Sequence, residues 1–508
     1  MKALFFLKNY LTESKYIAPM EQIMQEIKTY YYYRYLTPNG VIMAFNRSLM
    51  RYKSILLLFF TPIFSFAQQI NKDSIQKNFQ KSLMYLAQNQ CTQTIECEQY
   101  TGEWDAYMQM KGFFFLLGTK SKYRDSNCFT TTGIHNILAE IYLTDSSQKQ
   151  ILPMLQNAFP EIRSYSAGVQ YNFWKLLPPR RDLRWGAEPN PVPRVHRPTT
   201  FLLEERFINN AANVENDADD TAMGNLAVWY HQKIFGIDTL TMAKTQIFDN
   251  YLDKNRKNRH WYNYLYHGFK KSGAYMTWLG QEAEFDNWYF FRNVEHNLIF
   301  FLPASICYPI PYKPYIPWGT NDVDVVVNAN VLTYLAKNKM TQQSKGSDAA
   351  HQLIEKHARR GHWNRMGIYY PNRYHFHYAV SRALASGDTA LWASGKLLLQ
   401  HLAKSQKADG SYASRQRVNK RDILQSTAYA SLSLLYLKEA GFDVPKSLIA
   451  NSIAFMDKHK IIKDNQTHWH GGVYFSGGTV VRNTLYFTSD AYTTALVALC
   501  YQKYFLQF

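Results

Sequence analysis

Cysteine is scarce in this sequence, and its five cysteines have no metal-binding spacing. Cys91, Cys97, Cys128, Cys307 and Cys500 form neither a CxxC pair nor a Cys/His pattern, which excludes the common zinc modules. In an oxidising compartment a disulfide can form among Cys91, Cys97 and Cys128, although their spacing does not determine the pairing. The odd number leaves at least one thiol, and Cys500 suits a buried position.

Several short catalytic signatures are also missing. The segments GSYAS and SGG contain no Gly-x-Ser-x-Gly elbow, which removes support for a serine hydrolase triad. No Gly-Lys-Ser/Thr follows the Gly-rich stretch 476–479, so a phosphate-binding loop is not expected. His375 and His377 would need a third ligand from elsewhere to hold a metal ion. We therefore expect neither a metal site nor a cofactor.

No apolar run reaches the roughly 20 residues that a membrane-spanning helix needs. The longest run, SILLLFFTPIFSFA, follows the basic stretch Met50–Lys53 and ends in small residues at Ala67. This pattern is typical of a secretory signal peptide over 50–67, with cleavage after Ala67. Residues 1–49 are then an N-terminal extension or a mis-called start, and 68–508 form one domain. We expect the protein to be secreted or periplasmic.

Acidic residues are fewer than basic ones, and the formal net charge is +18. This balance permits an anionic partner and peripheral contact with a membrane, but no nucleic-acid-binding module is recognisable. Hydrophobic residues make up 46% and aromatic residues 16% of the chain, a composition typical of a globular protein with wide aromatic surfaces.

Six segments share one design, a polar start followed by small and apolar residues at helical spacing. They span 130–143, 216–230, 319–336, 374–385, 421–437 and 487–504. One such helix cannot bury its own apolar face, so the repetition predicts an all-α fold in which helices form a closed or stacked array. Their small residues allow helix backbones to approach closely.

Turns and long loops separate these helices. QKADGSY at 406–412 and WHGGVY at 469–474 combine glycine with an aromatic residue, and Gln90 with Gly102 and Trp104 is a weaker relative. In such turns glycine supplies a positive φ, glutamine binds neighbouring backbone and the aromatic side chain seals the turn. The stretches 178–198 and 303–318 are rich in proline, which predicts long loops that either wall a site or cover the outer surface.

The stretch NDADDTA places Asp217, Asp219 and Asp220 at the start of an apolar helix. Aspartate is a poor helix former and is seldom buried without a partner. Two explanations remain open. The carboxyls can cap the helix, because Asp accepts hydrogen bonds from free N–H groups there. Alternatively, neighbouring carboxyls in an apolar pocket keep one of their number protonated, because adjacent like charges resist ionisation.

DADDTA at 217–222 resembles the DxDDTA motif of class II terpene cyclases, the squalene-hopene and oxidosqualene cyclase group. QKADGSY resembles the repeated turn of the same group, although Tyr412 stands where that turn has Trp. The resemblance implies an α/α toroid, a ring of helical hairpins, and makes Asp219 the general acid that protonates an isoprenoid, with Asp217 and Asp220 tuning it. No DDxxD motif is present, so ionisation of a diphosphate with the help of magnesium has no support.

The chemistry of such an enzyme suits this composition. A strong, desolvated acid is needed to protonate an alkene, and aromatic faces stabilise the resulting carbocation without capturing it. The chain departs from the group in its secretory signal and in its shorter length. An isoprenoid cyclase or isomerase is therefore the first hypothesis, with a small hydrophobic substrate.

A second acidic helix start, Asn321–Asp324, leaves other functions open. Asp324 and Asp219 could pair as the acid and base of a toroidal glycan-active enzyme, a glycosidase or lyase, with a glycan substrate. A third hypothesis is a non-catalytic binding module whose carboxyls only cap helices. The residues that we expect to contact a substrate are Asp322, Asn328, Trp318, Tyr374 and His377.

Overall fold

The computed structural model describes residues 71–110, 122–178, 194–200, 212–237, 239–257, 272–282, 314, 316, 321–364, 366–414, 422–477 and 485–508. The chain divides into two units, Met1–Phe66 and Ala67–Phe508, and all described residues belong to the second. The predicted extension and signal peptide, Cys307, Trp318 and most of both proline-rich stretches lie outside the described residues.

All six segments predicted as helices are helical. They are α5 (Cys128–Thr144), α8 (Ala218–Phe235), α12 (Val325–Lys337), α14 (Arg373–Ala385), α16 (Asp422–Glu439) and α18 (Asp490–Gln507). Each packs against the next in this order, and α18 packs against α5, so the six helices form a closed cycle of contacts. Their apolar and small polar residues are buried on nearly every side, as expected for helices with neighbours all round.

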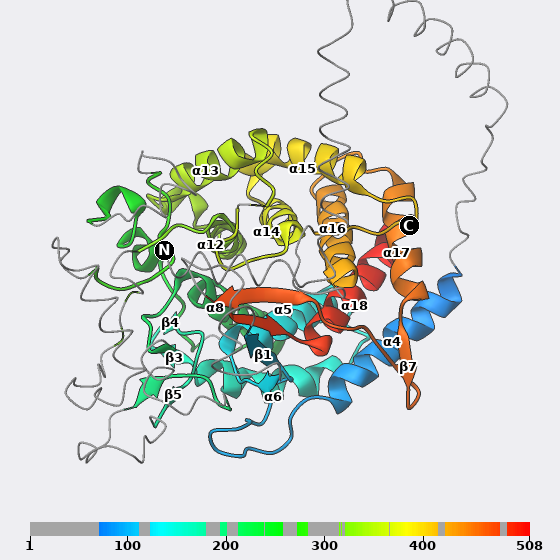
Figure 1. Ribbon diagram of the computed structural model, residues 1–508, viewed down its shortest axis with the longest axis horizontal. Coiled ribbons are helices and arrows are strands. Elements are labelled where there is room, and N and C mark those ends of the chain that lie inside the picture. Colours follow the sequence, from blue (N-terminus) through cyan, green and yellow to red (C-terminus); the bar gives the residue numbers. More distant parts are fainter. Residues whose placement is uncertain are drawn as a thin grey trace, which may run out of the picture. The chain divides into compact units, whose positions relative to one another are not determined.

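Five further helices pack against these six, and each has one exposed face. They are α4 (Lys72–Gln88), α6 (Ile151–Arg163), α13 (Ser347–Arg359), α15 (Trp392–Ser405) and α17 (Lys446–Lys458). Figure 1 shows α13 and α15 on the outer side of α12 and α14, in agreement with their contacts. A short helix, α9 (Thr245–Asp249), and the 3₁₀ turns η2 (Asp253–Asn255), η5 (Thr341–Gln343) and η6 (Thr389–Leu391) complete the helical structure of the described residues.

Two of the predicted turns, those that contain Gly102 and Gly410, contact the outer helices in the same way. Gly102 and Gly410 both have positive φ, +94° and +85°. Gln90 donates its side-chain amide to the carbonyl of Met154 in α6 at 2.9 Å, and Gln406 donates to the carbonyl of Leu448 in α17 at 2.7 Å. Both turns therefore fasten to the N-terminal half of an outer helix, which confirms the roles predicted for Gly and Gln in these two turns. The prediction is wrong for the turn at 469–474, because Gly471 and Gly472 do not have positive φ.

The aromatic residues of these turns are also buried. The indole N–H of Trp104 donates to the carbonyl of Leu86 at 2.8 Å, and that of Trp469 donates to the carbonyl of Met456 at 2.8 Å. Tyr412, which replaces a tryptophan of the resembling motif, is fully buried. Each aromatic ring thus covers the turn it follows.

The prediction of an all-α fold is wrong in one respect, because small sheets are present. One sheet has the order β2 (Tyr123–Arg124), β1 (Tyr107–Met110), β10 (Leu485–Thr488) and β9 (Val473–Gly477), all antiparallel. Three two-stranded sheets pair β3 (Ser166–Ala167) with β4 (Gln170–Tyr171), β5 (Leu176–Leu177) with β6 (Val195–His196), and β7 (Ile461–Lys463) with β8 (Gln466–His468). The strands are short, and β1 pairs with a partner far away in the sequence.

The disulfide that the sequence permits among three of the cysteines is not formed. Cys91, Cys97 and Cys128 are free thiols. Cys128 is fully buried at the start of α5, where its sulfur lies 3.4 Å from the hydroxyl of Thr132, so it faces its own helix.

Over the described residues, no helix combines the length and apolar character that crossing a bilayer requires.

Candidate functional site

Two of the predicted acidic residues cap the helices that they precede. The carboxylate of Asp217 accepts the backbone N–H of Asp220 at 2.7 Å and caps α8. Asp324 caps α12 by accepting the backbone N–H groups of Val326 and Val327, and its second oxygen accepts the N–H of Tyr369 at 3.0 Å. Capping thus explains Asp217 and Asp324 without any catalytic role.

Asp219 does not cap its helix. Its Oδ1 accepts a hydrogen bond of 2.7 Å from the side-chain amide of Asn330 on α12, and the side chain is buried. Burial raises the pKa of Asp219 well above its usual range, and the Asp217 carboxyl raises it further. The hydrogen bond from Asn330 and the charge of Arg382 act in the opposite direction. The raised pKa shifts Asp219 toward its protonated form, the state in which a carboxyl can act as an acid.

Asp220 is a third carboxyl at this helix start with a raised pKa. It lies in the first turn of α8 and is buried, and its pKa is raised well above the usual range by burial and then by the Asp217 and Asp219 carboxyls. Three carboxyls therefore share one water-poor helix start, so they cannot all be ionised together. The Asp217 carboxyl raises the pKa of Asp219, whereas the tuning role assigned to Asp217 and Asp220 stays a prediction.

A chain of hydrogen bonds leads from Asp219 to Arg382. The Arg382 guanidinium donates from Nη2 to Oδ1 of Asn330 at 2.9 Å, and Asn330 donates from Nδ2 to Asp219. Arginine can only donate, so its position fixes the orientation of the Asn330 amide. The positive charge polarises this amide toward Asp219, which favours the carboxylate that forms when Asp219 loses a proton.

A small cavity lies beside this chain, between the helices. Asn330, His375, Tyr378, Arg382 and Tyr492 supply its polar wall, and Phe129, Ile137 and Met223 are among its apolar residues. The space open to a water-sized sphere is about 10 Å³, roughly the room for one water molecule. Asp219 itself does not line this cavity, but its partner Asn330 does.

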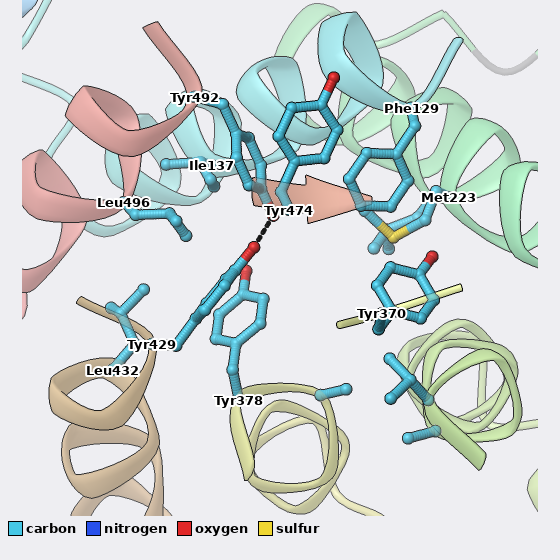
Figure 2. Packing of buried hydrophobic residues seen from close by; sticks show 14 of the residues in the cluster. Phe129, Ile137, Met223, Tyr370, Tyr378, Tyr429, Leu432, Tyr474, Tyr492 and Leu496 are labelled. Carbon is cyan, nitrogen blue, oxygen red and sulfur yellow. Dashed lines mark hydrogen bonds between the residues drawn. The ribbon is translucent and has the colours of Figure 1, made fainter. Parts of the chain in front are cut away.

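Aromatic rings lie on and behind the cavity wall. Phe129, Tyr378 and Tyr492 line the cavity, and Tyr429 and Tyr474 pack against these rings (Figure 2). Phe129 stacks on Tyr474 with ring centroids 5.5 Å apart, and the hydroxyl of Tyr429 donates to that of Tyr492 at 3.3 Å. Such a wall offers several π-faces to a bound molecule.

The structure places the remaining predicted site residues apart from the cavity. Tyr369 donates its hydroxyl to Asp322 at 2.7 Å, and Asn328 exchanges hydrogen bonds with the backbone of Tyr275. His377 contacts His401 of α15, with 2.9 Å between Nε2 and Nδ1, on the outer side of α14. Tyr374 lies on the same side, 6.2 Å from the His401 ring. Their roles in substrate binding stay predictions.

Sequence reasoning missed the residues of α14 that do line the cavity, which are His375, Tyr378 and Arg382. Their spacing of three and seven residues places them on one helix face, and this spacing was the signal available. Burial lowers the pKa of His375 well below its usual range, so its imidazole is neutral. Over the residues that the structure describes, no three His, Cys, Asp or Glu side chains cluster as a metal site would require.

Comparisons with known proteins give only distant similarity. No family model matches the sequence, and no curated protein matches it. The apo type II terpene cyclase MstE from Scytonema is similar in structure, with 12% identity, a TM-score of 0.49 and coverage of 86% of this chain and 100% of MstE.

Two other solved structures are similar to the same extent or less. A variant of MstE bound to its substrate, geranylgeranyl dihydroxybenzoate, has the same identity and TM-score and covers 86% of this chain and 99% of its own. A protein from Actinoplanes has 10% identity, a TM-score of 0.44, and coverage of 85% and 99%. Similarity at this level assigns the chain to no family.

Proposed function

We propose that this protein is an α/α toroid related to class II terpene cyclases, and that it cyclises or isomerises an isoprenoid by protonation from Asp219. The observation that supports this most is that Asp217 and Asp219, both at the start of α8, make different contacts. Asp217 caps the helix, whereas Asp219 is buried, carries a raised pKa and bonds to a different helix. A carboxyl needed only as a cap would not be arranged in this way.

The proton transfer follows from these contacts. Oδ1 of Asp219 accepts from Asn330, so the proton resides on Oδ2. The electron pair of a substrate double bond takes this proton, the O–H bond breaks, a C–H bond forms and the neighbouring carbon becomes a cation. The carboxylate left behind is stabilised by Asn330 and, through it, by Arg382. Loss of a proton from a carbon next to the cation forms a new double bond, and that proton restores Asp219.

The present cavity is too small for this substrate. Pockets that bury small molecules span roughly 300–1,000 Å³, whereas this space admits about one water. Binding must therefore part the aromatic side chains and open the cavity toward Asp219. The glycan-active alternative requires an open cleft over Asp219 and Asp324, but both side chains are buried. It has no specific support.

Asp219→Asn tests the proposal, because asparagine keeps the size of the side chain and cannot donate the acidic proton. Wild type and variant are incubated with a panel of polyprenyl alcohols and acids, and products are identified by mass spectrometry. We expect product from wild type and a loss of at least about 100-fold in the variant. Asp73→Asn, an exposed residue in the first turn of α4, is the matched control and should leave turnover unchanged.

Asp217→Asn separates capping from electrostatics. Asparagine caps a helix about as well as aspartate, so stability should stay close to wild type. Loss of the carboxyl removes a contribution that raises the pKa of Asp219, and turnover should therefore change at neutral pH. Equal turnover by wild type and Asp219→Asn would contradict the proposal.

A further inference from the structure

Arg382 is a buried cation with no anionic hydrogen-bond partner among the residues that the structure describes. Its side chain lies on the cavity wall, and the residue is 6% exposed. In the described part of the chain its hydrogen-bond partners are the Tyr378 hydroxyl at 3.3 Å, the Met223 thioether at 3.2 Å and the Asn330 carbonyl at 2.9 Å. None of these carries a negative charge. A buried guanidinium without a counter-charge is costly to the folded state.

One edge of this guanidinium is available to a ligand. The Nε–H of Arg382 is buried and has no hydrogen-bond partner in the structure. The neighbouring Nη2 directs one of its bonds at the sulfur of Met223, which is a weak acceptor. Nε–H and Nη2–H point the same way along one edge of the planar group, and a carboxylate can accept from both at once.

The surroundings of Arg382 favour a single negative charge. Tyr378 lies under the guanidinium, with its ring centroid 5.1 Å away, and the neutral His375 and Tyr492 share the cavity wall. Arg382 is the only Lys or Arg among the described residues that line this cavity. One guanidinium balances a monoanion such as a carboxylate, whereas a diphosphate requires several cations.

We propose that the substrate of this site carries a carboxylate, which binds the Nε and Nη2 edge of Arg382 in place of the Met223 sulfur. The identification of the rest of the substrate as an isoprenoid rests on the proposed function; the carboxylate does not. Neutralising Arg382 also removes a like charge that would oppose a carbocation in the same cavity. An isoprenoid acid therefore fits the site better than the corresponding alcohol.

Binding of two probes that differ only in their head group tests this inference. Farnesoic acid and farnesol are titrated into the full chain at pH 8, where the acid is ionised, and binding is measured by isothermal titration calorimetry. We expect wild type to bind the acid at least about tenfold more tightly than the alcohol. Arg382→Met keeps an unbranched side chain without the charge and should abolish this preference while retaining affinity for farnesol.

Two controls make the result specific. Arg163→Met removes an arginine of α6 that bonds to Tyr171 away from the cavity, and this variant should keep the preference for the acid. Asp219→Asn should keep it as well, even though turnover is lost, so a failure of the proposed chemistry is distinguishable from a failure of the carboxylate site. Thermal unfolding checks that each variant is folded.

Three results would overturn the inference, and one would support bidentate binding. Equal affinities of wild type for the two probes would overturn the inference, as would the absence of any binding of farnesoic acid. Retention of the acid preference by Arg382→Met would overturn it too. Partial retention by Arg382→Lys, which keeps the charge but lacks the planar edge, would support bidentate binding.

Discussion

Asn330 donates its side-chain amide to the carboxyl of Asp219 at 2.7 Å, from a helix more than one hundred residues further along the chain. This bond distinguishes Asp219, the proposed acid, from Asp217, which caps the same helix. It also transmits the charge of Arg382, because the same amide accepts from the guanidinium.

Replacing Asn330 by leucine should therefore weaken the acid. The variant keeps a side chain of similar size and removes the donor that stabilises the Asp219 carboxylate, so the pKa of Asp219 should rise further. Turnover requires the protonated form and falls as pH rises through this pKa. The basic limb of the pH–rate profile should then move to higher pH, while the maximal rate falls about 10- to 100-fold because proton transfer becomes less favourable.

The measurement is the pH dependence of kcat on the substrate found in the panel. Asn338→Leu is a control, since the side chain of this residue at the end of α12 bonds only the backbone carbonyl of Tyr334 among the described contacts. An unchanged basic limb in Asn330→Leu would contradict the role given to the amide.

Stability should also depend on pH through Asp422, which begins α16. Burial raises the pKa of Asp422 from 3.8 to about 7. The folded state thus binds this proton more tightly than the unfolded state. The stabilisation is complete below pH 3.8 and is lost as pH rises to about 7, at roughly 1.4 kcal/mol for each unit in the limit of full coupling.

Asp422→Asn removes this titration and retains the contacts. Its oxygen can accept from Asn372 and its amide can donate to the hydroxyl of Ser426. The free energy of unfolding of the variant, relative to wild type, should increase from pH 4 to pH 7 in urea titrations. Asp409→Asn is the control with the opposite sign, because hydrogen bonds lower the pKa of Asp409 in an exposed turn. A flat difference for Asp422→Asn would count against the raised pKa.

The repeated turns make a third prediction. A methyl group on Gly410 would lie 2.2 Å from the carbonyl oxygen of Asn451, and the φ of Gly410 is +85°. Gly410→Ala should lower the free energy of unfolding by about 2–4 kcal/mol, because both the turn and its contact with α17 must shift. Gly168→Ala has a similar φ of +67° but open space around it, so it should cost only about 1 kcal/mol. Comparable losses for the two variants would show that the contact with α17 does not matter.

The sequence predicted the helices well because each follows a polar residue and continues with small and apolar residues. Asn127, Asp217, Asp324, Asn372 and Ser489 cap five of the six. The sheet escaped prediction because Tyr107 of β1 pairs with Thr488 of β10, and no local pattern reports a partner so distant.

The site was predicted in part for a similar reason. The acidic stretch indicated Asp219 correctly as a buried carboxyl, but the sequence could not separate a cap from an acid, because that depends on Asn330 of another helix. In α14 the prediction chose His377, whereas the cavity face carries His375 and Arg382. Two residues along a helix turn it by more than half a circle, so His377 lies on the face of α14 opposite to the cavity.

The position of α18 in the order of contacts bears on how the protein folds. This helix packs against both α16 and α5, and strand β10 directly before it pairs with β1 near the other end of the second unit. A ribosome-bound chain lacking residues 485–508 would leave α5 and α16 without their shared neighbour. Native assembly must therefore wait until synthesis reaches this segment, and contacts across such a long stretch of chain slow the final step.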